Sequence, residues 1–338
     1  ASLKLAKQYF YEIGKPQKHK VISRRQSYHG NTLGALAAGG NLWRRSFFED
    51  LLTETSLISP CYQYRHQRSE ENSRDYGLRV ANELEKEIIK LGPDNVMAFI
   101  AETVVGATAG ALTPVEGYFK RIREICNQYD VLLILDEVMC GMARTGSLFA
   151  CDNEGVIPDI ITIAKGLGAG YQPIAAMLCQ NFIYEAIAKG TGFFQHGHTY
   201  LGHPVACAGS LAVLNKLINE NYPEQVNKKG EILQKKLELI IGQHEFVGDI
   251  RGRGLFRGIE IVKDRNTKNP FQKNLNIAGK IKKEALDMGL ICYPMQGTVD
   301  GIIGDHILIA PPFIINDLEI DELCEKLKKT IDNVCYQN

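Results

Sequence analysis

Short, almost continuously apolar runs alternate with helical patterns along the first half of the chain. The runs that we predict as strands are "KVIS" (20–23), "VMAFIAE" (96–102), "VLLILDE" (131–137), "DIITIAK" (159–165) and "IAAMLC" (174–179). Segment 117–130 places four apolar side chains on one helical face: Phe119, Ile122, Ile125 and Cys126. Strands that are apolar on both faces and alternate with amphipathic helices predict an α/β fold with a mostly parallel sheet flanked by helices.

The second half of the chain has a different pattern. From residue 204 to about 242 it is long and helical, and it then changes to short strands around "GDIRGRGLFRGIEIV" (248–262). Further helices are expected around 274–288 and 317–333. We therefore predict a large domain over residues 1–215, and a long connecting helix with a smaller C-terminal α+β domain over residues 216–338. The polar stretch 63–77 is interpreted as a long surface loop whose charges only interact with solvent.

Composition excludes several classes of partner. Lys plus Arg and Asp plus Glu both number 39, so the net charge favours neither nucleic acid nor an anionic membrane. No apolar stretch approaches the ~18 residues of a spanning helix, and the first residues do not show the pattern of a signal peptide. Nine cysteines without a CxxC pair, in a chain of 338 residues, predict reduced thiols and a cytoplasmic protein. The opening "ASLKLAKQYFYEIG" starts without Met inside a helical pattern, so we expect a missing upstream segment.

Two charged residues stand where predicted strands end. Asp136 closes "VLLILD", and Lys165 ends "DIITIAK" directly before the glycine-rich "GLGAGY". Ligands of open parallel sheets bind outside the carboxyl ends of the strands, so both side chains are expected at the same edge. From this pattern alone, a partly buried structural ion pair between Asp136 and Lys165 is as good an interpretation as a functional site.

The sequence lacks the motifs that three other kinds of binding site require. "LLILDE" resembles the apolar strand of a nucleotide hydrolase, but no GxxxxGK[ST] loop stands upstream. Dinucleotide fingerprints fail at Tyr171 in "GLGAGY" and at Arg257 in "GRGLFRG". His196, His198 and His203 have no acidic residue or cysteine near them in sequence to complete a metal site, so no metal is predicted. The chemistry that remains is one that uses a primary amine and a carboxylate together. These are the polar anchors of pyridoxal phosphate, because the amine condenses with an aldehyde and the carboxylate keeps a pyridine nitrogen protonated.

The segment "LLILDEVMCGMARTGSLFACDNEGVIPDIITIAKGLGAGYQPIAAML" resembles the class III pyridoxal-phosphate-dependent aminotransferases of fold type I, the ω-amino acid:pyruvate and ornithine-type enzymes. Further blocks in the family's order are "SYHGNTLGAL" (27–36), "FIAETVVGATAG" (99–110), "HGHTYLGHPVACAG" (196–209), "RGRGLFRGIEIV" (251–262) and "GDHILIAPPF" (304–313). Together they cover nearly the whole chain. The resemblance implies a fold type I transferase with pyridoxal 5'-phosphate as its cofactor.

The resemblance also implies roles for the two charged residues and for those around the cofactor ring. Lys165 would form the internal aldimine and, once displaced by substrate, would move the proton between substrate and cofactor. Asp136 would pair with the pyridinium nitrogen. Val138 would pack on one face of the ring and Tyr28 on the other, where an aromatic beside a glycine suits stacking. His29 would lie beside Tyr28.

Two more residues are assigned by the same resemblance. Glu102 would lie near the cofactor's 3-hydroxyl side. Thr199 would reach the phosphate from the neighbouring subunit, so that the active enzyme is a homodimer. The family's glycine-serine loop for the phosphate precedes the segment that opens this chain. We therefore expect these 338 residues alone to bind the cofactor weakly or not at all.

One departure concerns the substrate carboxylate. Many family members carry an arginine in the C-terminal region for this group, but residues 293–312 contain none. Arg253 and Arg257 are the nearest candidates, and each is interpreted first as structural. The predicted activity is a ping-pong transfer of an amino group from an (ω-)amino acid or amine to a keto acid such as pyruvate. Two alternatives stay open: a 1,2-aminomutase acting on an amino aldehyde, and a truncated, non-catalytic member of the family.

Overall fold

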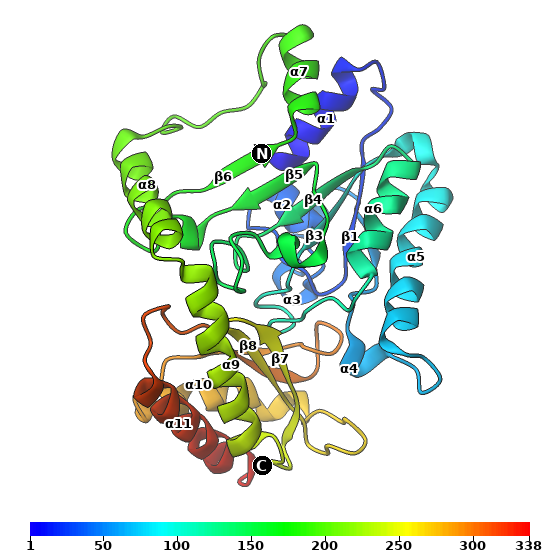
Figure 1. Ribbon diagram of the computed structural model, residues 1–338. Helices are drawn as coiled ribbons and strands as arrows, with labels where there is room; N and C mark the ends of the chain where they lie inside the picture. The colour runs from blue at the N-terminus through cyan, green and yellow to red at the C-terminus, as the bar shows by residue number, and fades with distance from the viewer.

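The computed structural model describes residues 1–338 and contains two sheets, each with its own helices (Figure 1). The strands are β1 (Lys20–Arg24), β2 (Ser56–Ile58), β3 (Val96–Glu102), β4 (Leu132–Asp136), β5 (Ile160–Ile163), β6 (Ala176–Cys179), β7 (Val247–Arg253), β8 (Phe256–Ile261), β9 (Tyr293–Gln296) and β10 (Asp305–Ile309). The α-helices are α1 (Ser2–Glu12), α2 (Leu33–Ala38), α3 (Leu42–Arg45), α4 (Gln63–His66), α5 (Ser73–Leu91), α6 (Tyr118–Gln128), α7 (Asn181–Lys189), α8 (Pro204–Asn219), α9 (Tyr222–Ile241), α10 (Ile277–Asp287) and α11 (Asp317–Cys335). No helix is both long and apolar enough to cross a membrane.

The larger sheet has the order β2-β1-β3-β4-β5-β6. Its first five strands are parallel, and only β6 runs antiparallel to β5. This confirms the predicted mostly parallel sheet, and all five strands predicted from the first half of the sequence are present. The three-residue β2 was not predicted, because so short a run carries too little apolar periodicity to stand out.

Helices cover both faces of the larger sheet, as its uniformly apolar strands require (Figure 1). On one face, α5 and α6 bury side chains such as Leu84 and Ile122 against Phe99 and Leu133 of the sheet. On the opposite face, α1 and α7 pack against the alternate strand residues, which include Ile134. The strands can therefore present polar groups to solvent only where they end.

The smaller sheet is antiparallel, in the order β7-β8-β10-β9, and its two faces differ in chemistry. One face carries Ile259 and Ile307, which pair across β8 and β10 and pack with α9, α10 and α11. The next pair along the same strands, Glu260 with His306, points to the other face. The helical pattern predicted from 204 to 242 is two helices, α8 and α9, separated at Asn221, whose φ of +50° interrupts the helix. The domain division after residue 215 stays a prediction, and α8 spans that point.

The interpretation of residues 63–77 as a solvated loop is wrong. Residues 63–66 form α4, and α5 begins at Ser73, where the side chain of Asn72 accepts a hydrogen bond from the backbone N–H of Asp75 at 2.9 Å. Arg65 is nearly buried and pairs with the fully buried Glu260 at 2.6 Å. A charge on a polar stretch of sequence thus finds a partner almost 200 positions away, which no local pattern could indicate.

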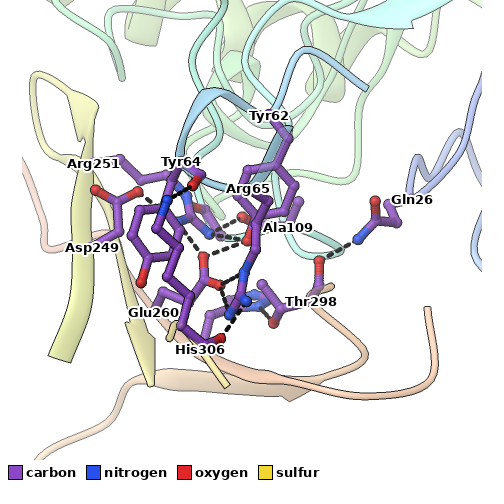
Figure 2. A network of polar contacts seen from close by, with 12 residues as sticks. Gln26, Tyr62, Tyr64, Arg65, Ala109, Asp249, Arg251, Glu260, Thr298 and His306 are labelled. Atoms are coloured by element: carbon purple, nitrogen blue, oxygen red, sulfur yellow. Dashed lines mark hydrogen bonds and ion pairs between the residues drawn. The ribbon is translucent and has the colours of Figure 1, made fainter. Parts of the chain in front are cut away.

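A buried polar network joins the smaller sheet to the loop that follows β3 (Figure 2). Arg251 donates to the carbonyls of Ala109 at 2.6 Å and Gly110 at 2.9 Å, and it pairs with Glu260 at 2.7 Å. Its side chain is only 7% exposed, and the charged groups of Arg65, Asp249, Arg251 and Glu260 each have a partner of opposite sign. The network holds the two sheets in one relative position on the side where β3 ends.

Candidate active site

Three parallel strands place polar residues at one edge of the larger sheet. Glu102 ends β3 and lies in register with Asp136, which ends β4, and Asp136 is in turn in register with Thr162 of β5. Lys165 follows two residues after β5. The expectation that Asp136 and Lys165 come from adjacent strand ends is met, because β4 and β5 are neighbours and run in the same direction.

Both oxygens of the Asp136 carboxylate are held. Oδ2 lies 2.8 Å from His29 Nδ1, and Oδ1 accepts the backbone N–H of Val138 at 3.0 Å. The side chains of Asp136 and His29 are 8% and 2% exposed. Because an ionised carboxylate can only accept, Nδ1 carries the proton of this hydrogen bond, and Nε2 faces Ser23 Oγ at 3.4 Å. The arrangement fixes a carboxylate in one orientation and leaves each oxygen a lone pair for a further donor.

Glu102 fixes the turn that carries Tyr28 and His29. Its Oε1 accepts the N–H of Tyr28 at 2.9 Å, and its Oε2 accepts the N–H of Gly106 at 2.7 Å. Burial raises the pKa of Glu102 above its ordinary value, while His29 and the two N–H donors act in the opposite direction. The side chain therefore ties the turn after β1 to the loop after β3, and its approach to the cofactor's 3-hydroxyl side stays a prediction.

Lys165 begins a short 3₁₀ turn over Lys165–Leu167, with a φ of +45°. The strand ends at Ile163, two residues before the predicted end, because this turn directs the chain away from the sheet. The side chain of Lys165 is exposed and makes no hydrogen bond or ion pair within the protein. Asp136 pairs with His29 instead, so the structural ion pair between Asp136 and Lys165 that the sequence left open is not formed.

Gly166, which follows this lysine, lies very close to the segment that follows β4. A Cβ on Gly166 would lie 2.9 Å from the Cβ of Met142, in the segment that follows β4. This contact holds the turn of Lys165 against the chain that leaves Asp136. Only glycine fits without moving one of the two segments.

Of the remaining predicted site residues, two lie at the strand edge and one does not. Tyr28 and Val138 are half-buried at the same edge, next to His29 and Asp136 respectively. Thr199 is exposed in the connection between α7 and α8, and no hydrogen bond joins it to any other predicted site residue. Within one chain, then, the structure assembles six of the seven predicted residues around one strand edge and leaves Thr199 apart.

The arginines considered for a substrate carboxylate are already engaged. Arg253 pairs with Glu154, whose side chain is 6% exposed. Arg257 donates to three backbone carbonyls, those of Gly230, Gly252 and Gly254. Neither guanidinium is available to a ligand without breaking these contacts. Sequence analysis missed a third arginine, Arg44, whose guanidinium lies 4.5 Å from the ring centre of Tyr28.

The histidines of residues 196–203 take local roles. His203 accepts the N–H of Ala206 at the start of α8, and the rings of His196 and His198 pack edge to face at 4.9 Å. No group of three or more His, Cys, Asp or Glu side chains is placed to hold a metal ion. A cavity of about 800 Å³ lies beside α1 and contains none of the predicted site residues.

The residues at the strand edge fit a pyridine aldehyde that carries a protonated ring nitrogen. Asp136 is buried, oriented and able to accept one more donor, and the amine of Lys165 is free. The structure thus places the two predicted anchors of pyridoxal phosphate at one edge of the larger sheet.

Comparison with known proteins identifies the family. The family model described as "Aminotransferase class-III" matches residues 1–331, and the chain belongs to this family. A protein of Schizosaccharomyces pombe described as an uncharacterized aminotransferase is 46% identical over 334 residues, which is 97% of this chain and 72% of that protein. The resemblance stated from the sequence is confirmed.

Solved structures agree with this assignment. An (S)-enantioselective ω-transaminase from Thermomicrobium roseum superimposes with a TM-score of 0.91 at 34% identity, covering 98% of this chain and 72% of that one. The ω-transaminase from Pseudomonas jessenii in complex with PMP gives 0.92 at 32% identity, covering 99% and 73%. The chain is thus a pyridoxal-phosphate-dependent aminotransferase by family and fold, and the aminomutase and non-catalytic alternatives are not favoured.

Proposed function

We propose that this protein transfers an amino group from an ω-amino acid or amine to a keto acid such as pyruvate, with Lys165 and Asp136 as its catalytic residues. The observation that carries the proposal is the buried His29–Asp136 pair at 2.8 Å, one strand away from an unpaired lysine. This buried carboxylate is oriented by two hydrogen bonds and forms no ion pair with a lysine or an arginine, which favours a functional role over a structural one.

Each residue of the edge has a definite task in this proposal. Asp136 would accept a hydrogen bond from the cofactor's ring nitrogen and keep that nitrogen protonated, and His29 holds the carboxylate in the orientation for it. Lys165 would bind the cofactor through its aldehyde carbon, and its Nζ would afterwards move the proton between the substrate carbon and the cofactor. Tyr28 and Val138 exclude water from the two faces of the ring. Bound pyridoxal phosphate supplies an electron sink for the carbanion that forms when the substrate loses this proton.

The test is a half-reaction with one amino donor at a time. The complete protein, purified and supplied with pyridoxal phosphate, should lose its visible absorbance as the donor converts the cofactor to its amine form, and pyruvate should restore the absorbance. The Lys165→Ala protein should show neither change. Cycling by the variant at the rate of the wild type would contradict the assignment.

We further propose that the working unit is a homodimer in the cytoplasm, in which Thr199 serves the neighbouring site. Large apolar side chains are exposed around this residue: Phe193, Tyr200, Leu201 and Val205. A surface of this kind favours a protein partner. All nine cysteines are free thiols, which suits a reducing compartment.

Hybrid dimers test the placement of Thr199. Lys165→Ala and Thr199→Val chains should each be impaired alone. When the two are expressed together, a mixed dimer has one site with the intact Lys165 of one chain and the intact Thr199 of the other, so activity should reappear. If each chain used its own Thr199, every site of the mixed dimer would be impaired and co-expression would restore nothing.

A further inference from the structure

Arg44 differs from every other arginine of the chain. Each of the others is either exposed or donates its guanidinium to a partner within the protein. Arg44 is half-buried, makes no ion pair and donates no side-chain hydrogen bond, and its Nε is buried without a partner. Buried donors of this kind are normally satisfied, since leaving one unpaired costs free energy. What distinguishes Arg44 is that its whole guanidinium has no hydrogen-bond or ion-pair partner within the protein and remains free to bind a ligand.

The guanidinium of Arg44 lies within cation–π distance of two aromatic rings. It is 4.5 Å from the ring centre of Tyr28 and 5.3 Å from that of Trp43. An arginine stacked on an aromatic face keeps its N–H groups in the plane of the guanidinium, where they remain free to donate. Two parallel N–H groups match the two oxygens of a carboxylate.

The backbone holds Arg44 and Tyr28 in a fixed relation. The N–H of Gly40 donates to both the carbonyl and the hydroxyl of Ser27, each at 3.0 Å, and the N–H of Gln26 donates to the carbonyl of Gly40 at 3.1 Å. Asn41 then caps the short helix α3 by accepting the N–H of Arg44 at 3.0 Å. The segment that carries Arg44 is thus joined directly to the turn that carries Tyr28 and His29.

The same turn is held from the smaller sheet. The side chain of Gln26 donates to the carbonyl of Thr298, whose hydroxyl contacts His306 Nδ1 at 2.5 Å (Figure 2). The carbonyl of Gln26 accepts the hydroxyl of Thr108. Because the backbone of the turn is fixed on both sides, Tyr28 keeps its place beside the guanidinium of Arg44, and a ligand beside Tyr28 lies within reach of that guanidinium.

We propose that Arg44 binds the carboxylate of the amino-acid or keto-acid substrate. This rests on the proposed function, which places the reacting centre beside Tyr28. The chain has no arginine in residues 293–312, and Arg253 and Arg257 are engaged elsewhere. Arg44 therefore gives the protein a preference for substrates that carry a carboxylate over simple amines.

Trp43 is the only tryptophan of the chain and provides a direct readout that does not depend on catalysis. Butyrate, a carboxylate without an amine, should change the fluorescence of Trp43 in a saturable way, and 1-butanol should not. In Arg44→Met, the Kd for butyrate, measured by fluorescence and by the heat of binding, should rise about tenfold or more. Arg74→Met, which removes an exposed arginine without partners, should leave the Kd unchanged. An unresponsive wild type, or an unchanged Kd in Arg44→Met, would overturn the proposal.

Kinetic measurements on the protein with bound cofactor distinguish two roles of Arg44. In one it recognises the substrate carboxylate, and in the other it only supports the ring of Tyr28. For 4-aminobutyrate, Arg44→Met should raise KM at least tenfold with kcat little changed, and Arg44→Lys should lie between the two proteins. For butylamine, which lacks the carboxylate, Arg44→Met and the wild type should have the same kcat/KM. Equal losses for both substrates would show that Arg44 only supports Tyr28. If the proposed function itself failed, the wild type would convert neither substrate, while the butyrate titration would still report on Arg44.

Discussion

His29 Nδ1 and Asp136 Oδ2 lie 2.8 Å apart, although the two residues are separated by 107 positions in the chain. The side chains are almost completely buried at the carboxyl ends of β1 and β4, two strands that flank β3. One residue fixes the orientation of the other before any ligand arrives. Preorganisation of this kind is what an electrostatic contact to a cofactor requires, because no reorganisation is then needed during the reaction.

The charge of Asp136 is predicted to be essential for the chemical step and dispensable for folding. Asp136→Asn keeps the shape, and its Oδ1 can still accept the N–H of Val138. It cannot keep a ring nitrogen protonated. We expect the half-reaction to slow by several powers of ten, each worth ~1.4 kcal/mol of barrier, while cofactor is still bound. Stopped-flow absorbance measures the step, and turnover close to that of the wild type would show that the carboxylate is structural.

His29 should act on the reaction only through Asp136. His29→Ala removes the donor and leaves a buried carboxylate with one fewer partner, so we expect weaker cofactor binding and a loss of roughly tenfold to a hundredfold in kcat. His29→Gln can still donate to Asp136 and should recover much of both quantities. The comparison uses the cofactor Kd and kcat of the three proteins. Equal kcat values in the alanine variant and the wild type would leave the pair without a functional role.

The parts of this site that sequence predicts are those set by local pattern. The run "VMAFIAE" matches β3 over Val96–Glu102, and Asp136 stands at the end of β4, because apolar runs define strands and the direction of parallel strands defines their common edge. Lys165 follows from the same logic. These features require no knowledge of contacts between distant segments.

The parts that sequence does not predict are pairings between distant segments. Nothing local indicates that Arg65 reaches Glu260, and the charges of residues 63–77 were therefore misassigned to solvent. The stacking of Arg44 on Tyr28 depends on how Gly40 docks against the turn after β1, where a Cβ would lie 2.2 Å from the carbonyl oxygen of Arg24. The glycine pair at 39–40 is a usable signal in retrospect, since a close backbone approach is a common reason for glycine outside a turn.

A buried carboxyl in the smaller sheet predicts a pH dependence of stability. Asp305 is 1% exposed, and burial raises its pKa from 3.8 to about 6, although its Oδ1 accepts the N–H of Ala278 at 3.1 Å. The folded protein therefore holds this proton more tightly than the unfolded chain. The contribution of Asp305 to stability is fully present below about pH 4 and is lost as the pH rises through 6, which amounts to up to about 3 kcal/mol.

Asp305→Asn removes this dependence and keeps the acceptor for Ala278. The variant should be more stable than the wild type at pH 8, and the difference should shrink as the pH falls toward 4. Urea unfolding of both proteins at several pH values measures it. Burial also lowers the pKa of His306 to about 3, so its contribution is lost as the pH falls from 6.5, but this is common to both proteins and cancels in the comparison. A difference that does not vary with pH would rule out Asp305 as the cause.

The most direct test of the proposed site is to identify the lysine that binds the cofactor. Borohydride should reduce the bond between pyridoxal phosphate and the protein, and peptide mapping should then locate the pyridoxyl group. We predict that it is found on the peptide that contains Lys165, and that the Lys165→Ala protein remains unlabelled after the same treatment. Label on a different lysine of the wild type, with none on Lys165, would contradict the assignment of the site.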